Sequence, residues 1–578
     1  MKISFLAEIP LKLQIKSPLK LFADTPDFSI HIRGDDYEFM AWGDPIYDDR
    51  FLQDLPLQRN IRFITENISG HYYFIFNDFK KNEIAFGTSP FSVVPLYYCV
   101  KGNSIILSDN VFTIAGHTGL KNVSARFVIE SILFNYPLFN CTLVEGVSLL
   151  DSCSALVAGS DNYRIVRHTV TEEWFCNDPV SWKKSLSVMT DIFLNAIEKY
   201  LPGEHYLTAL TGGFDSRTLA ASGLFHRRTF SGYCMGSTMT GDMSIAAEIS
   251  SKAGIPFVPV LLDGHYVRNE SLEAGKKFII KSSGTGTFSR AHYIYASALL
   301  GRETRYLVTG NFGSEVLRAV HTPGVMISPL LYMAFMSRGP EEAVASLRKH
   351  SLMRLMSADV IENELRNIEE DISGLPCFER RYIGIGSNMQ LYLYIFEEVF
   401  RKYFGSELSG QWSRVINRTP FLDRHFLKEL LSTGLAGINS GYLEKRPGRR
   451  YKGQILYASV IQKAAPCFGT YMTDKGYRPD DLLTIWGKSR ILTGWLRKRV
   501  SRAIIPNTDP MAVHEAWDHN RIWYESLPVN DDMFNKREID SLRGPGFSNV
   551  KARLYSLIFA ADYLRHLPEP YEQDLPAY

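Results

Sequence analysis

The stretch Thr211-Gly212-Gly213-Phe214-Asp215-Ser216-Arg217 decides the fold that we expect for this chain. The apolar residues 206–210 before it predict a short buried strand, and residues 218–222 after it predict the first turns of a helix. Glycines let a backbone approach an anion closely, and a helix N-terminus offers free N–H groups and a positive dipole end. The stretch therefore predicts a phosphate-binding turn. It is not the P-loop of kinases and GTPases, because the Gly-Lys-Ser/Thr ending is missing.

Strands and helices alternate on both sides of this turn. Strands are expected at 228–233, 256–262 and 305–309, with helices at 185–201 and 243–253. This alternation predicts a parallel, doubly wound sheet, in which sites lie at the carboxyl ends of the strands. The turns after Leu210, Tyr233 and Thr309 are therefore expected to converge on one pocket. From about residue 342 onward the pattern is largely helical.

The first 180 residues have a different texture, with short alternating segments and few helices. The expected strands there are 61–64, 71–76, 84–87, 93–98 and 104–108, and one helix is expected at about 124–134. We therefore expect a mostly β, layered domain over residues 1–180 and a second domain over 181–578.

Composition narrows the functional classes. The chain has 578 residues, 45% hydrophobic and 22% charged, with a formal net charge of +2, which argues against a dominant nucleic-acid or membrane role. Its seven cysteines contain no Cys-x-x-Cys pair, as expected in a reducing cytosol. No run of about 18 apolar residues and no signal-peptide pattern occurs, so a cytoplasmic protein without a membrane span is expected.

Three further segments resemble one known family when they are taken in order with the glycine turn. They are Pro420-Phe421-Leu422-Asp423, Gly310-Asn311-Phe312-Gly313-Ser314-Glu315, and the pair formed by residues 70–78 and Pro95-Leu96-Tyr97-Tyr98. Over residues 60–480 the chain resembles class B asparagine synthetase and its relatives, the β-lactam synthetases and lasso-peptide cyclases. The resemblance implies an α+β N-terminal sandwich of the Ntn-hydrolase type. An α/β ATP-pyrophosphatase domain with a helical C-terminal part would follow it.

The resemblance also implies a site for ATP and Mg²⁺. The residues expected to bind the nucleotide are Thr211, Gly212, Gly213, Asp215, Ser216, Ser231, Tyr233, Thr309 and Gly310. Asp215 is expected to ligate Mg²⁺. Because Asn311 and Ser314 replace the family's acids, Glu315 is the nearest second ligand of full charge. The alternative for Asp215 and Ser216 is a turn that merely caps a helix, and Asp242 is open to the same two interpretations.

Three residues are candidates for catalysis. Lys475, in Thr473-Asp474-Lys475-Gly476, resembles the late lysine that stabilises the developing charge and the leaving pyrophosphate. Glu397 and Glu398 fall where relatives carry an acid that deprotonates the attacking amine. The alternatives are a solvated lysine and an exposed helix face paired with Arg401 and Lys402.

One expected feature of the family is missing. Its glutaminase uses a cysteine as the first residue of the mature chain, whereas Met1 is followed here by Lys2 and no cysteine precedes Cys99. We therefore expect a glutaminase fold without the glutaminase reaction. A basic amphipathic helix over 486–502 is a further expectation, read as a surface element or as a site for a leader peptide or acidic partner.

The leading hypothesis is an ATP-dependent ligase that activates a carboxylate as an acyl-adenylate and transfers it to an amine. The carboxylate belongs to a small molecule or a peptide, and the amine is ammonia or part of the substrate. Alternatives are lactam or macrolactam closure, asparagine synthesis from ammonia, and a nucleotide-binding scaffold with weakened catalysis. A homodimer and a precursor peptide are the partner classes left open, and no nucleic acid is expected.

Overall fold

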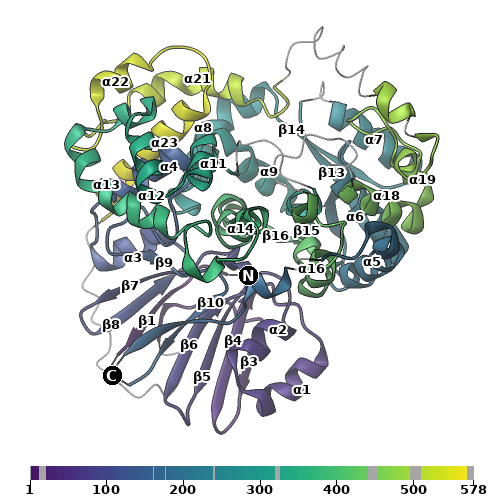
Figure 1. The fold of residues 1–578 in the computed structure, drawn as a ribbon, viewed down its shortest axis with the longest axis horizontal. Coiled ribbons are helices and arrows are strands. Elements are labelled where there is room, and N and C mark those ends of the chain that lie inside the picture. Colours follow the sequence, from purple (N-terminus) through teal and green to yellow (C-terminus); the bar gives the residue numbers. More distant parts are fainter. Residues whose placement is uncertain are drawn as a thin grey trace.

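The computed structural model describes residues 2–11, 21–160, 162–175, 178–237, 241–318, 324, 326–440, 452–487, 489–494 and 509–568. Figure 1 shows a β-rich part made by the N-terminal residues, a parallel sheet with its helices, and a mostly helical part built from later segments. Most of the 486–502 segment lies outside the described residues, so the expected basic helix is not described as a unit.

The N-terminal part contains two antiparallel sheets. The five-stranded sheet has the order β2-β1-β8-β7-β9, and the six-stranded sheet has the order β11-β10-β6-β5-β4-β3. The strands of the first are β1 (Leu6–Pro10), β2 (Phe22–Asp24), β7 (Tyr97–Lys101), β8 (Ser104–Ser108) and β9 (Ser148–Leu149). Those of the second are β3 (Ile30–Arg33), β4 (Tyr37–Gly43), β5 (Tyr72–Asp78), β6 (Glu83–Thr88), β10 (Ser154–Ala158) and β11 (Tyr163–Arg167).

The two sheets pack face to face over an aromatic core. Trp42 of β4 and Phe86 of β6 pack with Phe5, which comes just before β1, at ring distances of 5.1–5.6 Å. Helices α1 (Asp49–Gln58) and α2 (Ile61–Asn67) cover the outer face of the six-stranded sheet. Helices α3 (Val111–Thr118) and α4 (Ala125–Phe134) pack against residues of the five-stranded sheet. The result is the mixed, layered arrangement expected for the N-terminal part.

Two sequence expectations for this part are wrong. The segment 61–64 is helical, because the Asn60 side chain accepts a hydrogen bond from the Phe63 N–H at 2.8 Å and caps helix α2. The segment 93–98 is a strand only from Tyr97 onward. Pro95 cannot donate to a sheet ladder, and a short helix η2 (Pro90–Ser92) precedes it.

The second sheet is parallel throughout and has the order β14-β13-β12-β15-β16. Its strands are β12 (Tyr206–Ala209), β13 (Phe230–Gly236), β14 (Phe257–Leu261), β15 (Tyr306–Val308) and β16 (Ile416–Arg418). From β12 the chain adds β13 and then β14 on one side of the sheet. It then adds β15 and β16 on the other side of β12. The gap between β12 and β15 is thus a topological switch point, where such sheets bind ligands at their carboxyl edge. Sequence reasoning did not identify β16.

Helices surround this sheet and build the rest of the chain. The helices in the sheet region are α5 (Trp182–Glu198), α6 (Phe214–Phe225), α7 (Gly241–Ala253), α8 (Ser271–Lys281), α9 (His292–Leu300) and α10 (Gly313–Leu317). Those that follow are α11 (Pro329–Met336), α12 (Pro340–Arg348), α13 (Ala358–Ser373), α14 (Ser387–Tyr394), α15 (Gly405–Gln411), α16 (Arg424–Leu431), α18 (Lys452–Ala464), α19 (Pro466–Gly469), α21 (Val513–Glu525), α22 (Lys536–Ser541) and α23 (Asn549–Arg565). A π-helix, η8 (Ile395–Phe404), joins α14 to α15. Among the described helices, none has the length and apolar character that a membrane crossing requires.

Candidate nucleotide-binding site

The glycine turn lies between the end of β12 and the start of α6. Gly213 is the N-cap residue of α6 in extended geometry, and no side chain caps this helix end. Uncapped N–H groups at a helix N-terminus favour an anion. The turn also sits at the switch point between β12 and β15, so its position in the sheet agrees with the phosphate-binding turn predicted from the sequence.

Two hydroxyl groups fix the shape of the turn. Ser216 Oγ accepts a hydrogen bond from the Thr211 N–H at 3.1 Å and lies 2.9 Å from Thr211 Oγ1. Thr211 Oγ1 also accepts the Gly213 N–H at 3.1 Å. Ser216 is buried and lies in the first turn of α6. Its hydroxyl therefore stabilises the conformation of the glycine turn.

Gly212 forms hydrogen bonds through both its N–H and its carbonyl. Its N–H donates to Oδ1 of Asp242 at 3.0 Å, and its carbonyl accepts the Asp474 N–H at 3.1 Å. A Cβ atom at this position would lie 2.7 Å from Asp242 Oδ1, closer than real Cβ contacts allow. The Asp242 carboxylate, in the first turn of α7, therefore occupies one backbone donor of the glycine turn.

Asp215 connects the turn to the loop after β15. Its Oδ2 accepts the Ser314 hydroxyl at 2.9 Å and lies 3.9 Å from Arg318 Nη2. Its Oδ1 is buried without a well-aligned hydrogen bond among the described residues, and the Tyr457 hydroxyl lies near the carboxylate. Gly310 backs directly onto it, since a Cβ there would lie 2.7 Å from Asp215 Cβ. A buried carboxylate oxygen without a well-aligned hydrogen bond fits a cation ligand.

Glu315 lies close enough to Asp215 to interact electrostatically with it. Burial, followed by the Asp215 charge, raises the pKa of Glu315 to about 7, and Arg318 acts against that shift. Two carboxylates plus phosphate oxygens are a usual ligand set for Mg²⁺, so these residues fit the ion expected from the sequence. Within the described ranges, no group of three or more His, Cys, Asp or Glu side chains could hold a metal by itself.

Lys475 lies beside the turn, and its expected catalytic role stays a prediction. Its Nζ stands 5.1 Å from the centre of the Phe214 ring. Arg217, fully buried in α6, fixes the preceding segment by donating to the carbonyls of Phe468 (3.3 Å), Tyr471 (2.7 Å) and Met472 (2.9 Å). Burial lowers the pKa of Arg217 to about 10.

The other residues expected to bind the nucleotide, Thr309, Tyr233 and Ser231, have different surroundings in the structure. Thr309 Oγ1 donates to Asn417 Oδ1 at 2.7 Å and so links β15 to the strand beside it. Tyr233 is buried within β13, which continues to Gly236, so no turn follows Tyr233. Ser231 lies near the amino end of β13, where its Oγ is 2.9 Å from His205 Nε2. The contact expected from Ser231 and Tyr233 is one of their backbone to adenine, and it stays a prediction.

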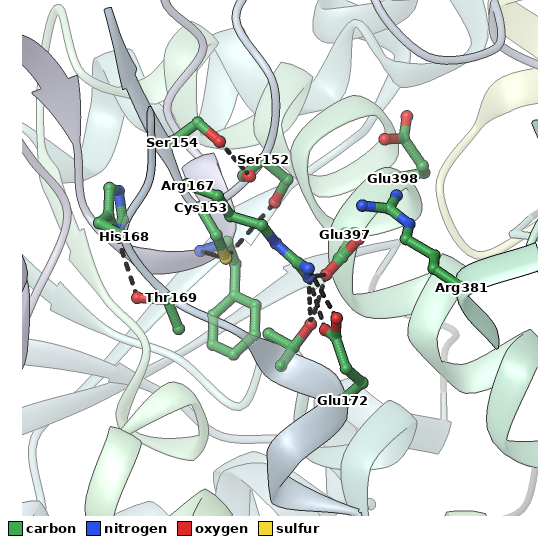
Figure 2. A network of polar contacts seen from close by, with 12 residues as sticks. Ser152, Cys153, Ser154, Arg167, His168, Thr169, Glu172, Arg381, Glu397 and Glu398 are labelled. Atoms are coloured by element: carbon green, nitrogen blue, oxygen red, sulfur yellow. Dashed lines mark hydrogen bonds and ion pairs between the residues drawn. The ribbon is translucent and has the colours of Figure 1, made fainter. Parts of the chain in front are cut away.

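Glu397 and Glu398 lie on the π-helix η8, and both are largely buried (Figure 2). Glu397 pairs with Arg167 and Thr171 of the N-terminal part, while Arg167 also binds Glu172 at 2.7 Å. Burial raises the pKa of Glu397. These contacts join the β-sandwich to the later helices.

Glu398 forms a buried ion cluster with two cations. Its carboxylate lies 2.6 Å from Arg401 Nη2 and 2.7 Å from Lys402 Nζ. The cations continue to backbone carbonyls of the N-terminal part, Arg401 to Leu150 and Lys402 to Pro137. The pairing with Arg401 and Lys402 was expected on an exposed helix face, but the cluster is buried between two parts of the fold.

The Pro420-Phe421-Leu422-Asp423 motif has a structural role at the site. Phe421 packs against Tyr457 and under Gly313, where a Cβ would lie 2.8 Å from the Phe421 ring. Asp423 caps α16 by accepting the Phe426 N–H at 2.9 Å. The motif thus supports the start of α10, which carries Ser314 and Glu315.

Sequence reasoning missed three residues of this site. They are Arg217, Arg318 and Tyr457. Burial and the charge of Asp215 raise the pKa of Tyr457. Arg217 stands within the quoted stretch and could have been noticed as a charge inside a buried helix. Arg318 and Tyr457 belong to no motif.

Of the described cysteines, Cys99 and Cys153 are held as thiols, because burial raises their pKa to about 11 and about 12.

Comparisons with known proteins found few similarities to this chain. No family model matches it, and no curated protein matches it. Similar solved structures include a glutamine phosphoribosylpyrophosphate amidotransferase from B. subtilis complexed with ADP and GMP, at 11% identity and a TM-score of 0.16 over 63% of this chain and 77% of that one. Another is described as the allosteric regulatory enzyme of purine biosynthesis, at 10% identity and a TM-score of 0.17 over 62% of this chain and 75% of that one. At TM-scores this low, neither likeness bears on the function of the site.

Proposed function

We propose that this chain is an ATP-dependent ligase that forms an amide bond, similar to asparagine synthetase. One observation carries the proposal: the uncapped glycine turn at the sheet's switch point is in contact with Gly310 on one side and Asp474 on the other. Asp215, Glu315 and Lys475 thereby gather around a helix N-terminus that suits a polyphosphate.

The proposed reaction has two steps. A carboxylate oxygen of the substrate bonds to the α-phosphorus of ATP, while the bond from that phosphorus to the bridging oxygen breaks and pyrophosphate leaves. An amine then bonds to the acyl carbon, loses a proton, and AMP leaves with the carboxylate oxygen. A bound Mg²⁺ would neutralise phosphate charge, and Asp215 and Glu315 would hold it.

The chain contributes positioning and charge to these steps. The α6 N-terminus and the turn amides would orient the phosphates, and the Lys475 ammonium would stabilise the charge that develops on the leaving pyrophosphate. Arg217 sets the position of the Lys475 segment through its three backbone contacts. We propose no catalytic role for Glu398, because its carboxylate is already paired with the buried cations Arg401 and Lys402.

The amine is proposed to be ammonia or part of the substrate. Closure of a lactam or macrolactam, on a small molecule or a peptide, is the form of the reaction in which the amine is part of the substrate. Synthesis of asparagine from ammonia is the form in which it is free.

A nucleotide-binding scaffold is the second candidate, and a specific contact favours it. Asp242 occupies the Gly212 N–H, and the Ser314 hydroxyl occupies one oxygen of Asp215. A protein that binds nucleotide without turnover could retain the contact between Ser314 and Asp215.

ATP–pyrophosphate exchange with a panel of aspartate, peptide and amino-sugar carboxylates tests the proposal. At least one carboxylate should support exchange, and Asp215→Asn should abolish it, whereas the exposed helix residue Asp54 serves as a control through Asp54→Asn. ATP binding without exchange for any carboxylate would favour the scaffold. Exchange that survives in Asp215→Asn would remove Asp215 from the mechanism.

A further inference from the structure

A second cleft lies where the N-terminal sandwich meets the later helices. It has a volume of about 420 Å³ and is lined from one side by residues such as Ser4, Tyr73 and Asp109 and from the other by Lys281 and Trp412. This volume falls within the range of small-molecule sites. None of its lining residues belongs to the glycine turn or to the loops around it.

Direct contacts across the cleft fix its walls. Asn110 Nδ2 donates to the Ile280 carbonyl at 2.8 Å, and the Val111 N–H donates to Ser283 Oγ at 3.2 Å. The Phe112 ring meets Tyr563 edge-on at 5.1 Å. A site held by such contacts binds with little loss of side-chain freedom, which favours affinity.

One end of the cleft suits an ammonium group. Asp109 accepts the Phe5 N–H at 3.2 Å, and burial raises the pKa of its carboxyl. Helix α8 ends in the lining at Lys281, and Ser413 and Leu567 line the cleft two residues after the ends of α15 and α23. The carboxylate at this end attracts a cation.

The cleft also holds groups that suit an acceptor or an anion. Trp412 is only 8% exposed, and its indole N–H has no hydrogen-bond partner in the described part of the chain. A buried donor of this kind is costly unless a ligand or water satisfies it. Lys281 is exposed at the rim and lies near enough to lower the pKa of Asp109, whereas Lys2 is already paired with Asp24.

We propose that this interdomain cleft binds a free α-amino acid with an apolar side chain. The ammonium group would face Asp109, the carboxylate would face the Trp412 indole N–H and Lys281, and the apolar body would lie against the rings of Tyr73 and Phe112. The pairing of one acid with one base and an orphan donor matches a zwitterion better than a simple amine or a simple acid. The proposal does not rest on the ligase activity.

Calorimetric titration of the full chain with three related probes tests the proposal. L-phenylalanine should bind, while phenethylamine and 3-phenylpropionate, which each lack one charged group, should bind about tenfold or more weakly. Asp109→Asn should weaken phenylalanine binding by about tenfold without weakening 3-phenylpropionate, and Trp412→Phe, which keeps the ring and removes the N–H, should also weaken phenylalanine. Asp54→Asn should change nothing.

Two results would overturn the inference. One is the absence of heat with phenylalanine and with L-leucine at millimolar concentration. The other is phenylalanine binding that is unchanged in both Asp109→Asn and Trp412→Phe, after thermal unfolding has shown that these variants are folded. Because ATP titrations of the same variants should match the parent chain, failure here is separable from failure of the proposed ligase.

Discussion

The backbone N–H of Gly212 donates a 3.0 Å hydrogen bond to the Asp242 carboxylate, within the turn that we propose binds phosphate. A negative group thus already occupies one donor of the proposed anion site. If the turn binds phosphate, the contact is a competitor that a ligand must displace.

Asp242→Ala should therefore tighten pyrophosphate binding. A hydrogen bond to a charged group contributes about 1.5–3 kcal/mol, so we expect a decrease in Kd of roughly tenfold in metal-free buffer. Isothermal titration with pyrophosphate measures it. Weaker binding in the variant would mean that Asp242 helps to hold the ligand.

Arg217→Met should lower stability and displace the Lys475 segment. The substitution removes three hydrogen bonds, to the carbonyls of buried Phe468, half-buried Tyr471 and exposed Met472. We expect the free energy of unfolding to fall by about 2–4 kcal/mol in urea titrations. A loss below about 0.5 kcal/mol, the level of ordinary surface changes, would contradict the assigned anchoring role.

Glu398→Gln and Glu397→Gln form a matched pair on helix η8. The first leaves buried Arg401 and Lys402 without a counter-charge and should cost about 3–5 kcal/mol of stability. The second should cost less, because Arg167 keeps its bidentate partner Glu172. Urea unfolding of both variants measures the two losses of stability. Equal losses would show that the Glu398 cluster stabilises the fold no more than the Glu397 contacts do.

Buried Glu130 should make stability fall with rising pH. Burial, and then neighbouring Asp371, raises the pKa of Glu130 well above its ordinary value of 4.5, while its Oε2 accepts the Leu138 N–H at 2.7 Å. A raised pKa in the folded state means that the stabilising contribution is present below about pH 4.5 and is lost as pH rises toward the folded value. Glu130→Gln cannot titrate, so its unfolding free energy should decline less than that of the parent chain between pH 5 and pH 8, as roughly expected from linkage. Parallel slopes in urea unfolding would refute this.

Much of the parallel sheet was predictable from the sequence. The strands around 206–210, 256–262 and 305–309 and helix 243–253 are all present near their expected bounds. Apolar runs bounded by glycines are strong local signals, and the alternation of strand and helix determines the layer arrangement. The closeness of Gly310 to Asp215 follows from the same topology.

The misses have physical causes in particular residues. Segment 61–64 looks like a strand because its apolar residues are dense, yet the Asn60 cap commits it to a helix. Glu398 with Arg401 and Lys402 has the spacing of a solvated helix face. The cations of the cluster donate to the carbonyls of Leu150 and Pro137, which are far away in sequence and help to bury it. Strand β16 has three residues, too few for a periodic signal.

The most direct test of the central claim is a calorimetric titration of ATP with Mg²⁺ into three proteins. In Gly310→Ala the new Cβ would lie 2.7 Å from Asp215 Cβ and disturb the turn, whereas at Gly203 nothing lies within 4 Å of the added atom. We expect one-site binding by the parent chain and by Gly203→Ala, and binding weakened by about tenfold or more in Gly310→Ala, because positioned contacts are lost. Equal binding by all three proteins, or no binding by the parent chain, would contradict the central claim.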